Sequence, residues 1–79
     1  MKMNEQSRLL LELIDGGDTN ARVILCSLIA REINTNLLGV LSLLEELYKA
    51  GFLVEKISRE LELTDKGKKY VKSQKVVAS

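Results

Sequence analysis

The side chains that most often perform catalysis are scarce in this sequence. It has no histidine, so the commonest general base and the commonest metal ligand are both missing. The single cysteine, Cys26, has no histidine to activate it, and its position in an apolar run predicts a small buried thiol. The pair Gly16-Gly17 lacks the Lys-Ser/Thr continuation of a phosphate-binding loop. We therefore expect no catalytic residue, no metal site, no cofactor and no enzyme activity.

Charge is the other chemistry that the sequence offers. The chain carries 12 basic and 11 acidic residues, a net charge of +1, and this balance alone does not indicate a polyanion-binding protein. The distribution is uneven, because the only acidic residue from residue 65 onward is Asp65, among several lysines. These lysines are Lys66, Lys68, Lys69, Lys72 and Lys75. Such a segment could contact an anionic partner or simply be solvated.

The spacing of apolar residues predicts the elements that would position these groups. A helix with one apolar stripe is expected over about 4–15, ending at Gly16-Gly17. A second helix over 20–32, capped by Thr19 or Asn20, is apolar on several sides, so we expect it to be central. The polar break at 34–36 predicts a tight turn, with Asn36 or Thr35 capping a third helix over 36–50. Gly51 is the expected stop of that helix.

The rest of the chain predicts a hairpin and a last helix. Two short apolar runs within 52–63, joined by a polar link, are typical of a two-stranded hairpin. Thr64 would cap a helix over 65–75, with Tyr70 and Val71 facing inward. A chain of 79 residues makes one domain. The expected fold class is mainly α (α+β): three helices, a two-stranded β-hairpin and a C-terminal helix in a single domain, 1–79.

Several segments, taken in this order, resemble the winged helix-turn-helix domain. Residues 27–36 are similar to its second helix and turn, with Ala30 where such domains place an alanine against the next helix. Residues 50–53 (Ala-Gly-Phe-Leu) resemble the step into the first wing strand. Residues 61–70 resemble the passage from the second wing strand into the final helix. The resemblance is to MarR-, PadR- and ArsR-like proteins and to minimal winged helices of archaea, viruses and plasmids. It implies a winged helix that binds duplex DNA as a homodimer and regulates transcription.

The resemblance also implies which residues would contact DNA. The start of the third helix would enter the major groove, and cations would contact phosphates. Asn36 could pair with adenine, Ser42 could reach a base or phosphate, and Leu37 could touch a thymine methyl. The third helix departs from the family pattern in having no Arg or Lys before Lys49. The expected contact set is Thr35, Asn36, Leu37, Gly39, Ser42, Arg31, Lys56, Arg59 and Lys66.

The sequence is also unusually rich in leucine. Too many leucines are present for one small core, which indicates an interface; they are Leu9, Leu11, Leu28, Leu37, Leu38 and Leu43. We expect the first helix, with the last as a second candidate, to join two copies. An alternative function is a protein-interaction module or small inhibitor acting through the apolar and acidic third helix. No apolar run is long enough to span a membrane, and a single cysteine without a signal peptide favours the cytoplasm.

Overall fold

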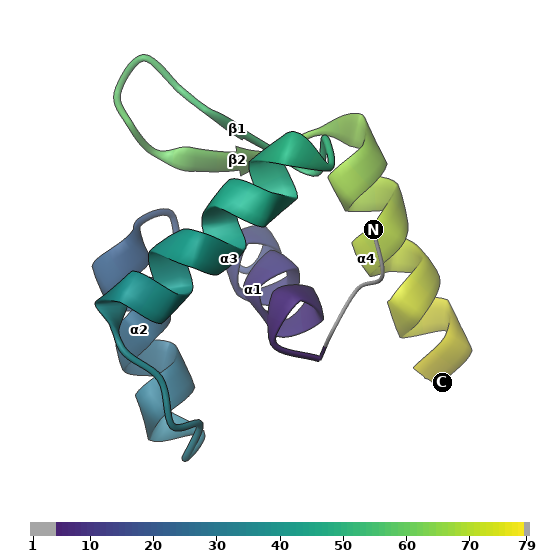
Figure 1. Ribbon diagram of the computed structural model, residues 1–79. Helices are drawn as coiled ribbons and strands as arrows, with labels where there is room; N and C mark the ends of the chain where they lie inside the picture. The colour runs from purple at the N-terminus through teal and green to yellow at the C-terminus, as the bar shows by residue number, and fades with distance from the viewer. Residues whose placement is uncertain (1–4, 79) are drawn as a thin grey trace.

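The computed structural model describes the backbone of residues 5–78 and the side chains of residues 5–73. Within this range the element order is α1 (Glu5–Asp15), α2 (Ala21–Ala30), α3 (Leu37–Lys49), β1 (Leu53–Glu55), β2 (Leu61–Leu63) and α4 (Asp65–Ala78) (Figure 1). The two strands form an antiparallel hairpin in which Leu53 pairs with Leu63 and Glu55 with Leu61. The expected mixture of helices with one small two-stranded sheet is therefore confirmed. Residue 4, where the first helix was expected to begin, lies outside the described residues.

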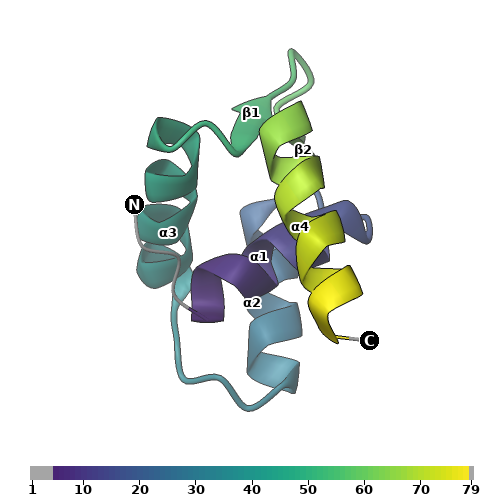
Figure 2. The same cartoon turned by 90° about the vertical axis from the view of Figure 1, so that its right-hand side faces the viewer.

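The central element is α1. It contacts α2, α3, β2 and α4, and Figure 2 shows it between α3 and α4. Its residues Leu10 and Leu11 are completely buried, and Ile14 is nearly so. These side chains fill the domain's own core, and the expected dimer contact through the first helix stays a prediction.

The prediction that the second helix is central was wrong. Only Ile24 and Leu28 of α2 are buried, whereas Val23 and Ile29 are exposed. One side of α2 meets α1 and α3. The opposite side is largely apolar and, within the described part of the chain, is exposed. Cys26 lies on that opposite side and is exposed, so the prediction of a buried thiol was also wrong.

Most of the leucines that the sequence assigned to an interface are in the core. Leu11 and Leu28 are fully buried, and Leu9 and Leu43 are partly buried against the same cluster. Only Leu37 and Leu38 of that set are exposed. The core can hold the other leucines because it is built from several elements: α1, α3 and the hairpin all contribute aliphatic residues to the same cluster. None of the helices in the described part of the chain has the length and apolar content needed to cross a membrane.

The helix starts follow the predicted caps. The side-chain oxygen of Asn20 accepts a hydrogen bond from the Val23 N–H at 2.9 Å, and that of Asn36 accepts one from the Gly39 N–H at 2.9 Å. At the start of α4, the Thr64 hydroxyl accepts a hydrogen bond from the Gly67 N–H at 3.1 Å. Each cap satisfies a backbone donor that the helix itself leaves unpaired.

The end of α2 comes two residues earlier than predicted. Glu32 has a φ of 63°, and the Ile33 N–H donates to the Leu28 carbonyl at 3.0 Å. This is the closing pattern of a helix whose residue after the cap is left-handed, a position that favours glycine. Gly51 occupies the equivalent position after α3, with a φ of 85°. The sequence did not predict the end of α2 because a glutamate gives no such signal.

A glycine allows α4 to pack closely against the chain at Phe52, next to the hairpin. Gly67 is buried, and a Cβ atom added there would overlap the carbonyl oxygen of Phe52. Around this contact, the rings of Phe52 and Tyr70 lie 5.6 Å apart, and the Thr64 hydroxyl donates to the Gly51 carbonyl at 2.6 Å. Val71 is buried and Tyr70 is half-buried, which confirms the predicted inward side of α4.

Candidate contact surface of α3 and the hairpin

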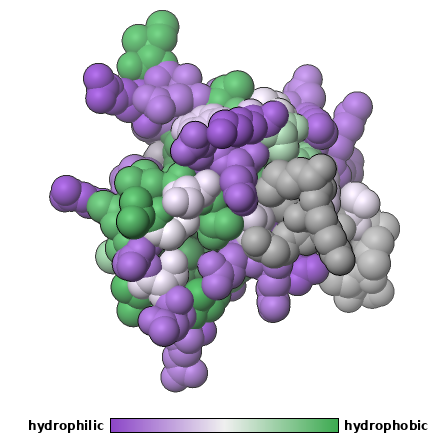
Figure 3. All heavy atoms as spheres, viewed as in Figure 1, coloured by the Kyte–Doolittle hydropathy of each residue, from purple (hydrophilic) through white to green (hydrophobic). Residues whose placement is uncertain are grey.

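The side of α3 that faces away from the core is exposed along the whole helix. Val40, Leu44 and Leu47 are buried, so the residues opposite them form an outward surface, which we call the α3 face. Its members are Leu37, Leu38, Leu41, Ser42, Glu45, Glu46 and Lys49. The first half of this face is apolar and the second half is acidic. Figure 3 shows apolar atoms gathered over α2 and the first half of α3.

The first turn of α3 has structural tasks of its own. The Asn36 oxygen that could accept from an adenine amino group already accepts the Gly39 N–H. Gly39 is half-buried, and an added Cβ atom would lie 2.9 Å from the Thr35 hydroxyl oxygen. Thr35 and Gly39 therefore pack against each other. Of the contact residues predicted at the start of α3, Leu37 and Ser42 remain: both are exposed and take no part in the cap or in the contact between Thr35 and Gly39.

Two of the four predicted cations lie at the hairpin turn. The Arg59 N–H donates to the Lys56 carbonyl at 2.8 Å, and the Lys56 N–H donates to the Glu60 carbonyl at 2.9 Å. Arg59 has a φ of 70°, the left-handed region that favours glycine. Both side chains are exposed. Both cations are therefore accessible to solvent, although Arg59 also lines a groove beside α3 and Lys56 a groove beside the end of α1.

The other two predicted cations lie elsewhere. Arg31 caps the end of α2 and is exposed. The ammonium of Lys66 donates to the Ala50 carbonyl at 2.8 Å and lies 4.8 Å from the centre of the Phe52 ring. Lys66 therefore links α4 to the end of α3 through a hydrogen bond and a cation–π contact. Its ammonium group is engaged in these structural contacts.

Charge is divided between two sides of the molecule. On the α3 face, Glu45 and Glu46 outnumber Lys49, which forms an exposed ion pair with Glu45 at 3.3 Å. The hairpin region also carries more carboxylates (Glu55, Glu60 and Glu62) than cations (Lys56 and Arg59). By contrast, the described part of α4 carries four exposed lysines against Asp65. Lys68 of α4 and Lys56 line a common groove between the end of α1 and the hairpin.

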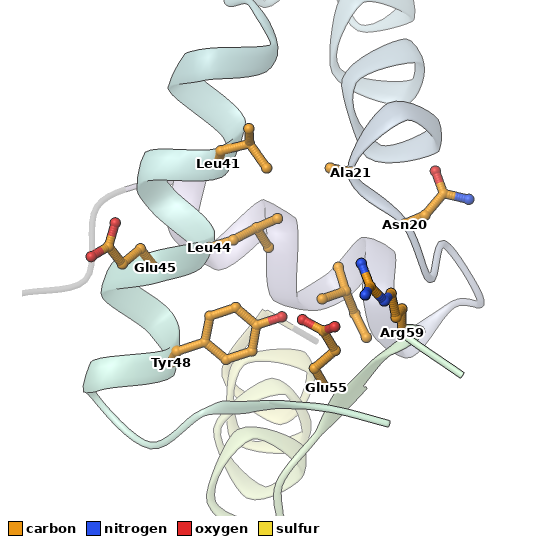
Figure 4. Close-up of a pocket in the computed structure, with 9 residues that line it drawn as sticks. Asn20, Ala21, Leu41, Leu44, Glu45, Tyr48, Glu55 and Arg59 are labelled. Carbon is orange, nitrogen blue, oxygen red and sulfur yellow. The ribbon is translucent and has the colours of Figure 1, made fainter. Parts of the chain in front are cut away.

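A second groove, beside α3, was missed by the sequence analysis. It lies between α3, the start of α2 and the hairpin and has a volume of about 340 Å³ (Figure 4). Its lining residues are Asn20, Ala21, Leu41, Leu44, Glu45, Tyr48, Glu55, Arg59 and Leu61. Burial, and to a smaller extent the charge of Glu55, raise the pKa of Tyr48 above its ordinary value. Leu41 is 47% exposed and lines this groove.

Comparison with known proteins does not assign the chain to a family. No protein-family model matches the chain, and no curated protein or solved structure shows significant similarity to it. Among the residues whose side chains are described, no group of three or more cysteine, aspartate or glutamate side chains is gathered closely enough to hold a metal ion. The surface formed by the α3 face and the hairpin is therefore interpreted from its own chemistry.

Proposed function

We propose that this chain is a winged helix-turn-helix domain that binds duplex DNA as a homodimer and acts as a transcriptional regulator. The observation that carries the proposal is the placement of α3. A six-residue connection, 31–36, joins α2 to this helix in place of the predicted tight turn. The helix leaves one side free along its whole length and has a projecting hairpin beside it (Figure 1). A helix exposed in this way can enter a major groove while the hairpin meets the adjacent backbone.

The chemistry of these surfaces favours contacts to phosphates over recognition of bases. The α3 face presents leucines and carboxylates, and Ser42 is its one exposed hydroxyl, so few groups can pair with base edges. The cations lie at the hairpin turn, at the end of α2 and along α4. Phosphate contacts supply affinity without sequence information. We therefore expect similar affinity for unrelated duplexes and a strong dependence on salt.

The test is fluorescence anisotropy with two labelled duplexes of unrelated sequence, titrated over a range of salt concentrations. If about four cations contact phosphates, the slope of log K against log[salt] is roughly −3 to −4. The double variant Lys56→Gln/Arg59→Gln should reduce that slope by about 2, since each lost phosphate contact reduces it by about 1. Arg8→Gln is the matched control, because Arg8 is an exposed cation on α1, which lies behind α3 in Figure 1. Absence of binding at low salt, or equal slopes for the double variant and the wild type, would contradict the proposal.

Ser42 is the right residue for testing base recognition. Substitution of Asn36 would remove a helix cap worth about 1 kcal/mol, so its effect on DNA binding would be mixed with an effect on stability. Ser42 is exposed and caps no helix. If contacts to phosphates dominate, Ser42→Ala should leave the affinity for both duplexes nearly unchanged.

One observation favours a second candidate function, a protein contact through the α3 face. Leu38 is 74% exposed and Leu41 is 47% exposed on adjacent turns of α3, and neighbouring exposed apolar residues often mark interfaces. A second copy is one such partner. Sedimentation equilibrium of the 8.9 kDa chain should then show self-association that Leu38→Ala weakens and Ile29→Ala, an exposed apolar control on α2, does not. A monomer at all concentrations would exclude the homodimer from the proposal.

A further inference from the structure

The groove beside α3 combines an apolar floor with two opposite charges. Ala21, Leu41, Leu44 and Leu61 supply the floor, and Tyr48 forms one wall. The volume of about 340 Å³ falls in the range of small-molecule sites, roughly 300–1,000 Å³. Figure 4 shows Leu41 and Leu44 pointing from α3 toward α2, and Tyr48 pointing toward Glu55 of the hairpin. A compact aliphatic group would therefore find contacts on several sides.

The charged groups come from the hairpin. Glu55 and Arg59 both line the groove and reach toward its apolar wall in Figure 4, with the Tyr48 hydroxyl beside Glu55. They form no ion pair with each other in the structure, so each can accept a partner of opposite charge. The Glu45 carboxylate points away from the groove in the same view and pairs with Lys49. The charges that face the groove are thus one carboxylate and one guanidinium.

We propose that this groove binds an apolar α-amino acid in its zwitterionic form. The ammonium group contacts the Glu55 carboxylate, the α-carboxylate contacts the Arg59 guanidinium, and the side chain lies on the floor formed by Leu41, Leu44 and Leu61. An α-amino acid joins these three features in one small molecule, because its ammonium, carboxylate and side chain all branch from one carbon. A guanidinium fork suits a carboxylate in particular. The site is open to solvent, so the expected affinity is in the millimolar range.

The probe is L-leucine, observed by the methyl resonances of Leu41, Leu44 and Leu61 in a ¹³C NMR titration. Two analogues remove one charge each: isoamylamine lacks the carboxylate, and isocaproate lacks the ammonium. L-Leucine should shift the groove methyl signals in a saturable manner and bind more tightly than either analogue. Signals that do not move with L-leucine, or equal affinity for L-leucine and either analogue, would overturn the proposal.

Two variants assign the contacts. Glu55→Gln should weaken L-leucine and isoamylamine by about fivefold, and leave isocaproate unchanged, since exposed charged contacts are worth about 1 kcal/mol. Arg59→Gln should do the reverse, weakening L-leucine and isocaproate. Glu62→Gln is the control, because Glu62 is an exposed hairpin carboxylate outside this groove. If both groove variants bind L-leucine as the wild type does, the assignment is wrong. These measurements contain no DNA, so their outcome does not depend on the proposed function.

Discussion

Substitution of Gly67 by alanine is expected to destabilise the protein, although Gly67 lies inside a helix. In an exposed helix, alanine is more favourable than glycine by about 1 kcal/mol. At Gly67 the added Cβ would overlap the Phe52 carbonyl oxygen, and would lie 3.3 Å from the Phe52 carbonyl carbon and 3.4 Å from the Leu63 Cβ. The first two are backbone atoms, so either α4 or the chain at Phe52 must move. Such overpacking costs about 1–3 kcal/mol.

Subtraction of the helix-propensity gain leaves a net destabilisation of about 1 kcal/mol. For a domain of this size, that lowers the melting temperature by about 4–8 °C, which thermal unfolding followed by circular dichroism can measure. Gly16→Ala is the matched control. A Cβ there would meet two carbonyl oxygens at 3.5 Å, an ordinary contact, so its melting temperature should not fall. A Gly67→Ala melting temperature at or above that of the wild type would refute the argument.

Three further predictions concern stability. Glu32→Gly should raise the free energy of unfolding by about 0.5–1 kcal/mol, because it relieves a left-handed non-glycine residue, whereas Gly51→Ala should lower it; urea titration checks both signs. Leu28→Ala should cost about 2–5 kcal/mol, because Leu28 is fully buried, while Leu38→Ala should stay within about 0.5 kcal/mol; similar losses for the two would show that Leu38 is not exposed. The raised pKa of Tyr48 means that its contribution to stability is complete below about pH 10 and is lost as the pH rises through the folded-state pKa. Tyr48→Phe should therefore reduce the loss of stability at alkaline pH, and an identical pH profile would argue against burial of the hydroxyl.

Local signals in the sequence predicted most of the fold. The cap at Thr64 was predicted, and the structure chooses Asn20 from the pair Thr19/Asn20 and Asn36 from the pair Thr35/Asn36. Each of the three accepts a hydrogen bond from a backbone N–H in the first turn of its helix. Gly51 marked the end of α3 for the same local reason. Such signals need no knowledge of the rest of the chain, and they placed the helix boundaries within a few residues.

The features that the sequence did not predict depend on contacts between distant elements. An apolar helix such as α2 could equally have been buried on all sides, and only its neighbours decide that Cys26 faces outward. The groove beside α3 joins Ala21, Leu41 and Glu55 from three separate elements, so no spacing rule could reveal it. The sequence predicted a set of contact residues, but it did not predict that Asn36 and Lys66 form structural hydrogen bonds.

The central position of α1 has a consequence for how the chain folds. The helix is synthesised before β2 and α4, which are among its neighbours. While the ribosome still holds the later segments, α1 has few surfaces on which to bury Leu10 and Leu11, and a helix of this length is marginal in water on its own. We therefore expect these elements to fold in one cooperative step once α4 has been synthesised, with no stable intermediate that lacks β2 and α4.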